Sequence, residues 1–300
     1  MKRRDRLMSS GWGRREFLGL LAASALAGKA RAAVTPRLAV IDWAMLETSV
    51  ALGIMPVAAT ELIQFRAGAV EPEIPETVSD LGLRGAPNLE LLQLTRPDLI
   101  LISPFYTRYT GRLEAIAPVF SLPFYVKGEP PFEKSLAAVS ALGEKLGRAD
   151  AARKVLDETH LALQAMRARL AGFASRPTYV INIGDARHFR AFGEDSMFGD
   201  ILGRLGLTNA WVDRSQFTFA APVPLENLAE VADARIVIVS DVPVEARESL
   251  RNSAIWRALP AVRENRVVTL GNVSPYGGIT AAMRFARLLT EALAIHGEAL

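Results

Sequence analysis

The longest amphipathic pattern in the chain covers residues 149–173. Its apolar positions recur at steps of three, four or seven residues, which predicts one uninterrupted helix. Asp150 is expected to cap its start, and Gly172 with the following Arg176-Pro177 pair its end. At about 1.5 Å per residue the helix is roughly 35 Å long. A mid-chain helix of this length fits either a strut between two lobes or an ordinary helix of a single α/β domain.

Short aliphatic runs alternate with helical patterns on both sides of this helix, as in α/β proteins. The expected strands are residues 37–42, 56–59, 98–102, 120–126, 178–183, 188–192, 236–239 and 266–270. The expected helices are residues 44–52, 88–94, 131–146, 196–205, 224–231, 256–260 and 280–295. A chain of 300 residues, half of them hydrophobic, is long enough for two cores. We therefore expect an N-terminal lobe over 36–147, a bridging helix over 148–173 and a C-terminal lobe over 174–300.

Two pairs of segments repeat each other in the two halves. Residues 89–103 and 225–240 both read Leu-Glu, a short helix, four aliphatic residues and Ser. In the second pair, Glu47 and Asp200 each lie five residues before Leu-Gly and an aliphatic residue. Lobes built on one plan would place these two acids at matching sites, although such repeats also arise by chance.

The first 33 residues resemble an export signal. The segment Arg14-Arg15-Glu16-Phe17-Leu18 precedes an apolar run over residues 18–27, and Ala30-Arg31-Ala32 follows. Paired arginines before this run are typical of twin-arginine export, with a general secretory leader as the alternative. Cleavage is expected near Ala32 or Ala33, which would release a soluble periplasmic protein, because the chain has no cysteine for a lipid anchor.

The basic isoelectric point of about 9.3 comes from this leader. Residues 1–33 carry eight lysines and arginines against two acids, or +6, whereas the whole chain carries +3. The remainder is therefore mildly acidic, at about −3, and gives no electrostatic reason to expect nucleic-acid binding.

A binding site is expected where the buried strand over 98–102 ends. Ligands of open α/β sheets bind beyond the carboxyl ends of the strands. The loop over 103–109 carries Phe105, Tyr106 and Tyr109 there, although it could instead pack on its own aromatic rings.

The sequence offers little that indicates catalysis. The three histidines are scattered, and no glycine-rich phosphate loop or nucleophile elbow is present. We expect no catalytic residue, no cofactor and no metal held directly by side chains. These features favour binding over turnover, with an exported enzyme carrying a bound cofactor as the alternative.

Several short motifs resemble the periplasmic substrate-binding proteins of iron-uptake ABC importers, and most closely their ferric-hydroxamate branch. The motifs are Leu83-Arg84 before Pro87-Asn88-Leu89-Glu90, Arg96-Pro97-Asp98, Ser196-Met197-Phe198, residues 206–211, and Tyr276-Gly277 before Ala281-Ala282-Met283. The resemblance implies two Rossmann-like lobes joined by one long rigid helix, with a ferric siderophore held in a cleft between them. It implies a monomer that delivers this ligand to an inner-membrane permease and its ATPase.

The resemblance also assigns roles to individual residues. Arg84 and Tyr106 would donate hydrogen bonds to iron-bound hydroxamate oxygens, and an unligated surface ion pair is the alternative for Arg84. The aromatic surface for the organic backbone would come from Phe105, Phe217, Phe219 and Tyr276. Glu47 and Asp200 would pair with arginines of the permease, or else be ordinary solvated helix acids.

One departure from this branch widens the range of ligands. Its cleft is lined with tryptophans, where this chain has Gly68, Thr218 and Ser274. A wider siderophore would therefore fit as well as a hydroxamate. Haem or a cobalamin is a further alternative, and Tyr106 could serve as an axial haem ligand.

Overall fold

The computed structural model describes residues 35–212 and 222–297. The expected leader lies outside these ranges, as do Phe217, Thr218 and Phe219. From Pro36 onward the chain forms one compact unit that contains two five-stranded sheets.

The first sheet is parallel throughout, in the order β3-β2-β1-β4-β5. Its strands are β1 (Leu38–Val40), β2 (Ala58–Ala59), β3 (Ser79–Asp80), β4 (Leu99–Ile102) and β5 (Val119–Ser121). The central strands β1 and β4 consist of buried aliphatic residues, as expected for a parallel sheet covered on both faces. The expected strand over 120–126 is shorter than predicted, because only its first residues pair with β4.

Helices surround this first sheet. They are α2 (Trp43–Ala51), α3 (Leu62–Gly68), α4 (Leu89–Leu94), the 3-10 helix η1 (Pro104–Tyr109), α5 (Thr110–Glu114) and α6 (Phe132–Lys145). Asn88 caps α4 as predicted, since its side chain accepts a hydrogen bond from the backbone of Leu91. Helix α3 was not predicted; it is short and begins where the backbone of Glu61 is left-handed.

The mid-chain helix α7 (Ala149–Arg169) is continuous and ends in a 3-10 turn, η2 (Ala171–Phe173). The predicted cap was wrong. Arg148 occupies the N-cap position, and Asp150 lies in the first turn, where its carboxylate is 2.8 Å from Arg153 Nη2. An acid there still favours the helix through its dipole.

The second sheet is mixed, in the order β10-β9-β6-β7-β8. Its strands are β6 (Thr178–Ile183), β7 (His188–Ala191), β8 (Val223–Pro224), β9 (Arg235–Ile238) and β10 (Val267–Thr269). Strands β6, β9 and β10 run parallel, whereas β7 and β8 are antiparallel to their neighbours. In both sheets the first strand is central, and the strand of the repeated segment, β4 or β9, lies parallel beside it.

The helices of this half are α8 (Met197–Arg204), the 3-10 helix η3 (Leu225–Ala229), α9 (Val244–Asn252), α10 (Ala254–Ala258), α11 (Pro260–Arg263) and α12 (Ile279–Gly297). The segment expected as a helix over 224–231 forms only η3, and α9 was not predicted. Ser196 caps α8 through a hydrogen bond from the backbone of Gly199.

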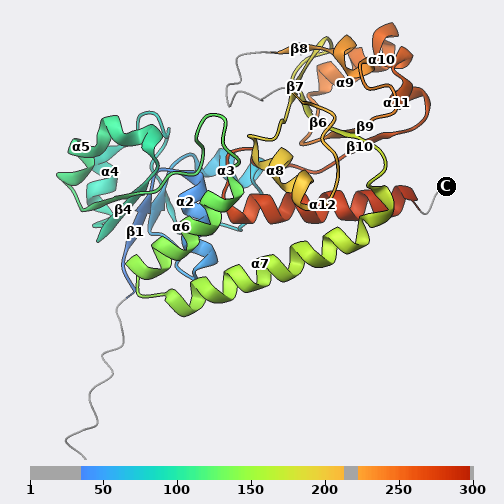
Figure 1. Ribbon diagram of the computed structural model, residues 1–300. Coiled ribbons are helices and arrows are strands. Elements are labelled where there is room, and N and C mark those ends of the chain that lie inside the picture. The colour runs from blue at the N-terminus through green and yellow to red at the C-terminus, as the bar shows by residue number, and fades with distance from the viewer. Residues whose placement is uncertain (1–34, 213–221, 298–300) are drawn as a thin grey trace, which may run out of the picture. The chain divides into compact units, whose positions relative to one another are not determined.

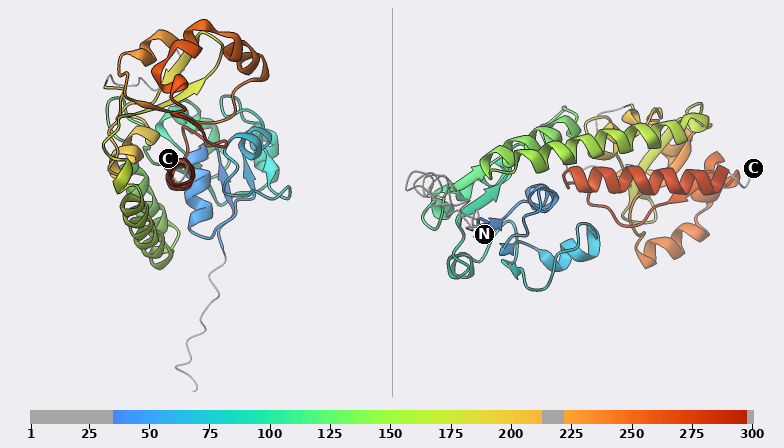
Figure 2. Two further views of the ribbon diagram at one scale, coloured as in Figure 1. Left: turned by 90° about the vertical axis from the view of Figure 1, so that its right-hand side faces the viewer. Right: turned by 90° about the horizontal axis from the view of Figure 1, so that it is seen from below.

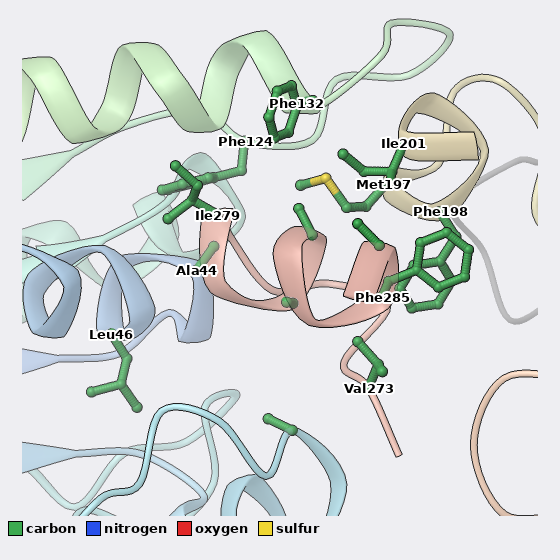
Figure 3. Packing of buried hydrophobic residues seen from close by; sticks show 14 of the residues in the cluster. Ala44, Leu46, Phe124, Phe132, Met197, Phe198, Ile201, Val273, Ile279 and Phe285 are labelled. Carbon is green, nitrogen blue, oxygen red and sulfur yellow. The ribbon is translucent and has the colours of Figure 1, made fainter. Parts of the chain in front are cut away.

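Helices α7 and α12 run side by side and connect the regions of the two sheets (Figures 1 and 2). One hydrophobic cluster contains residues of both halves, such as Ala44 of α2, Phe198 of α8 and Phe285 of α12 (Figure 3). The rings of Phe198 and Phe285 stack with centroids 4.7 Å apart. No helix within the described ranges has the length and apolar character needed to span a bilayer.

Candidate functional site

Polar and aromatic residues gather where the parallel strands of the first sheet end. Asp42 follows β1, Glu61 follows β2, Arg84 follows β3, and Tyr106 follows β4. Because neighbouring parallel strands end at one edge, these four loops lie together. Hydrogen bonds join Arg84 to Glu61 and Tyr106, and the charge of Asp42 acts on Arg84 and Tyr106.

Arg84 is fixed in position by Glu61. The Glu61 carboxylate accepts a hydrogen bond from Arg84 Nε at 2.6 Å and another from the Arg84 backbone nitrogen at 3.0 Å. The backbone of Glu61 is left-handed, with φ of 52°, a conformation that costs a non-glycine residue roughly 1 kcal/mol or more. The fold thus retains a strained backbone at the residue that orients Arg84.

Trp43 supports the face of the same guanidinium. The Arg84 Cζ atom lies 4.1 Å from the centroid of the indole ring, within cation–π range. The indole is itself held by a hydrogen bond of 3.1 Å to the Thr60 carbonyl and by edge contact with Phe65. With its face on Trp43 and its Nε on Glu61, the guanidinium is immobilised before any ligand arrives.

Tyr106 lies next to Arg84 in η1 and is half-buried. Burial raises the pKa of its phenol to about 12, the negative charges of Asp42 and Glu61 add to the rise, and the charge and hydrogen bond of Arg84 oppose it. The phenol is therefore neutral at physiological pH and available as a hydrogen-bond donor. Tyr109 of the same loop donates to the Gly85 carbonyl and so ties η1 to the loop of Arg84.

Asp42 anchors this edge rather than contributing a free charge. Its carboxylate accepts hydrogen bonds from the backbone of Ala44 and Met45 and from the Ser103 hydroxyl, at 2.8, 3.2 and 2.8 Å. Burial raises the pKa of Asp42, although these hydrogen bonds and the Arg84 charge work in the opposite direction.

Tyr276 comes from the other half of the chain, just before α12. Its ring meets that of Tyr125 edge-on, with centroids 5.6 Å apart, and burial raises the pKa of its phenol while the charge of Arg190 opposes the rise. Burial raises the pKa of the Tyr125 phenol well above its ordinary value, and the charges of Glu47 and Asp42 add to the rise. Tyr125 is therefore close to charged groups of the first half as well as to Tyr276.

The other residues expected to contact the ligand differ in whether and where the structure describes them. Phe105 follows β4 as predicted and is 64% exposed. Phe217 and Phe219 lie outside the described residues, together with Thr218. Two other positions carry tryptophan in the ferric-hydroxamate branch. Here Gly68 is half-buried at the end of α3, and Ser274 is buried.

Glu47 is not placed to meet another protein. It is fully buried in α2, and its Oε2 accepts hydrogen bonds from the backbone nitrogens of Gly278 and Ala281 at 2.7 and 2.9 Å. Its Oε1 is buried without a hydrogen-bond partner, and burial raises the pKa of this carboxyl to about 8. The predicted pairing with a permease arginine does not fit, because this side chain holds the start of α12.

Asp200 has the equivalent arrangement in the other half. Only 6% of its side chain is exposed, and its carboxylate accepts from the Phe132 backbone at 2.9 Å and from Arg204 Nε at 2.6 Å. Its expected permease contact is likewise incompatible with this position. The repeat in the sequence did match the two acids correctly, since each holds the first turn of a helix belonging to the opposite half.

Sequence reasoning missed Asp42, Trp43 and Glu61 as site residues. Each lies within three positions of the end of a strand that was predicted. The rule that ligands bind beyond these ends, applied to every strand of the first sheet, would have found them.

Two hollows lie away from this edge. One of about 570 Å³ lies between α7 and α12 beside Val155, Met166 and Met283. Another of about 260 Å³ lies beside Trp256 and Val267. Within the residues that the structure describes, histidines, aspartates and glutamates form no cluster able to hold a metal ion.

Two α/β lobes joined by a long helix, with hydrogen-bond donors collected at a strand edge, define the class of two-lobed binding proteins with a single bridging helix. The chain belongs to the periplasmic binding protein family, whose pattern matches residues 38–273.

Comparisons with individual relatives support this family assignment. The chain is 31% identical over 268 residues to the iron(3+)-hydroxamate-binding protein FhuD of Escherichia coli, covering 87% of this chain and 88% of that protein. It is 30% identical over 259 residues to the achromobactin-binding periplasmic protein of Dickeya dadantii, covering 79% of each. The crystal structure of the Fe3+-Desferal-bound FhuD of Vibrio cholerae superposes with a TM-score of 0.80 at 26% identity, covering 86% of this chain and 98% of that one.

Proposed function

We propose that this protein captures a ferric siderophore, of the hydroxamate type, and delivers it to an inner-membrane ABC permease. The observation that carries the proposal is the fixed guanidinium of Arg84 beside the neutral phenol of Tyr106. Iron in such a ligand is already fully coordinated by the siderophore. The protein then needs donors for the iron-bound oxygens rather than metal-coordinating side chains.

The charge of the site supports a hydroxamate ligand. Glu61 already balances Arg84, and burial raises the pKa of Asp42. A ferric trihydroxamate has no net charge at its iron centre, because the singly charged hydroxamates balance Fe3+. A tris-catecholate chelate is strongly anionic and would call for unpaired cations here. The relatives named for hydroxamate and for Desferal point the same way.

The raised pKa of Tyr106 bears on the haem alternative. An axial tyrosine ligates haem iron as the phenolate, and burial together with the charges of Asp42 and Glu61 disfavours the phenolate of Tyr106 by raising its pKa. Tyr106 is thus better suited to donate a hydrogen bond than to ligate iron. Relatives that are binding proteins weigh against the exported enzyme.

The delivery step and the location follow from the family together with the leader. We propose export through Arg14-Arg15, cleavage near Ala32 or Ala33, and a monomeric periplasmic protein with lobes at 36–147 and 174–300 on either side of the 148–173 bridge. The siderophore would lie between these lobes, on Arg84, Tyr106, Phe105 and Tyr276. Because the side chains of Glu47 and Asp200 are buried, the permease would be contacted by different residues that are exposed.

The test is a titration of the mature protein with ferrioxamine B, ferrichrome, a ferric tris-catecholate, ferric citrate, haem and cobalamin. Trp43 touches Arg84, so tryptophan emission should change when the ligand binds. A response to the hydroxamates alone supports the proposal, and a response to haem alone or to none of the six contradicts it.

Two variants connect the response to the site. Arg84→Ala should weaken ferrioxamine B binding about tenfold or more, because hydrogen bonds to charged groups contribute roughly 1.5–3 kcal/mol. Arg84→Lys should restore only part of the affinity, since an ammonium cannot present the same planar fork. Arg153→Ala on the exposed face of α7 is the matched control and should bind as the wild type does.

A further inference from the structure

The segment that carries Tyr276 is held by residues of the first lobe. Glu47 of α2 accepts hydrogen bonds from the backbone of Gly278 and Ala281, two and five positions after Tyr276. The Tyr125 hydroxyl donates to the Gly277 carbonyl, and the Tyr125 ring packs edge-on against Tyr276. Tyr276 belongs to the second lobe in the sequence, whereas its segment contacts two side chains of the first lobe, those of Glu47 and Tyr125.

The approach of Glu47 to this segment is unusually close. A Cβ atom added to Gly277 would lie 2.3 Å from Glu47 Oε1 and 2.4 Å from the Cβ of Ala281. A Cβ on Gly278 would lie 3.0 Å from the Ala44 carbonyl oxygen. Two successive glycines therefore let α2 approach the start of α12, and a buried carboxylate then fixes the contact.

The equivalent acid of the second lobe performs a different task. Asp200 holds the first turn of α6 at Phe132, and Arg204 extends that contact to Glu133 at 2.9 Å. None of these groups contacts the Tyr276 segment in the interactions above. Asp200 therefore provides a control that breaks the same kind of helix cap without touching Tyr276.

We propose that Glu47 and Tyr125 are positioning residues that fix Tyr276 against the first lobe, so that Tyr276 forms a preformed surface with Arg84 and Tyr106 before ligand binds. The ligand side of this inference rests on the function proposed above. The positioning itself is independent of any ligand. Loss of the Glu47 contact should release Tyr276 while leaving the geometry of Arg84 and Glu61 intact.

The experiment uses 19F NMR of ligand-free mature protein labelled with 3-fluorotyrosine. The chain has five tyrosines, and Tyr276→Phe assigns the resonance of interest. Glu47→Asp shortens the side chain so that the carboxylate no longer reaches both backbone nitrogens, and it should shift or broaden the Tyr276 resonance. Glu47→Gln keeps an oxygen acceptor on a side chain of the same length, so the Tyr276 resonance of this variant should match that of the wild type.

Binding of ferrioxamine B should follow the spectra. Glu47→Asp should weaken it about fivefold, in line with the loss of one ordered aromatic contact, and Glu47→Gln should restore it. Asp200→Asn should leave the Tyr276 resonance unchanged. If Glu47→Asp does not fold, Tyr125→Phe replaces it, because this variant removes only the hydroxyl that bonds Gly277.

The outcomes separate the two proposals. If the wild-type protein does not bind ferrioxamine B, the proposed ligand is wrong. A shift of the Tyr276 resonance in the Glu47→Asp variant would still support the positioning. An unchanged Tyr276 resonance in the folded variant, or an equal shift in Asp200→Asn, overturns the positioning whatever the ligand.

Discussion

Glu47 Oε2 lies 2.7 Å from the backbone nitrogen of Gly278, although 231 positions separate the two residues in the chain. The contact joins the first helix of one half to the last helix of the other. A buried carboxyl at the start of a helix is an uncommon means of joining two lobes, because its charge must be desolvated unless it takes up a proton.

The first prediction concerns the pH dependence of stability. Burial raises the pKa of Glu47 from its ordinary 4.5 to about 8, so the folded state favours the protonated form. This contribution to stability is complete below pH 4.5 and is lost as the pH rises through 8. The Glu47→Gln variant has no carboxyl to titrate at this position. By pH 9 the free energy of unfolding of the wild type should therefore have fallen, relative to that of the variant, by on the order of 4 kcal/mol.

Urea unfolding of both proteins between pH 5 and pH 9 measures this difference. The neighbouring groups Asp42 and Tyr125 are present in both, so subtracting the two curves isolates Glu47. Parallel curves over this range would show that Glu47 is ionised throughout.

The second prediction concerns Gly277. Gly277→Ala places a methyl group within 2.3 Å of a buried carboxylate oxygen and should destabilise the protein by about 1–3 kcal/mol, as overpacking does. Gly172→Ala, in a turn with open space around the new methyl, should stay within about 0.5 kcal/mol of the wild type. Thermal melts of the two variants make the comparison, and equal melting temperatures would be incompatible with the close approach.

The third prediction separates buried from exposed contacts between α8 and α6. Asp200→Ala leaves the Phe132 backbone nitrogen without its acceptor and should cost about 1–3 kcal/mol. Glu133→Ala removes only an exposed ion pair with Arg204 and should cost less than about 1 kcal/mol. Chemical denaturation in low and high salt checks the order. The effect of the exposed Glu133 pair should shrink more with salt than that of Asp200, whose own pair with Arg204 is largely buried.

The fourth prediction concerns Glu61, the partner of Arg84. Glu61→Gln keeps the side-chain shape but removes the charge that holds Arg84 Nε, so binding of ferrioxamine B should weaken about threefold to tenfold. Glu158→Gln on exposed α7 is the matched control and should bind normally. Unchanged binding in Glu61→Gln would mean that Trp43 alone suffices to orient the guanidinium.

Much of the fold was predictable because local patterns determine it. The period of residues 149–169 and the aliphatic runs of β4, β6 and β9 are signals that do not depend on tertiary contacts. The short helices α3 and α9 have no side-chain cap, so no capping residue in the sequence marks where they begin. Asp150 failed as a cap because the backbone places Arg148 at that position.

The site was predictable only in part, for a related reason. The resemblance to ferric-hydroxamate-binding proteins indicated Arg84 and Tyr106, and the structure brings them together. Glu61, their organising partner, is 23 positions from Arg84, and no local pattern links the two. For Glu47 and Asp200 the repeat predicted that the positions match. The repeat could not show that each side chain is buried and accepts a hydrogen bond from the start of a helix that is 68 or more positions away in the sequence.

The cluster that holds Ala44, Phe198 and Phe285 has a consequence for how the chain folds. Because α12 and α2 contribute to the same core, each half depends on the other to bury part of its apolar surface. We expect one cooperative calorimetric transition and insoluble fragments when the chain is cut after Leu170. The halves repeat one architectural plan, yet they have become a single folding unit.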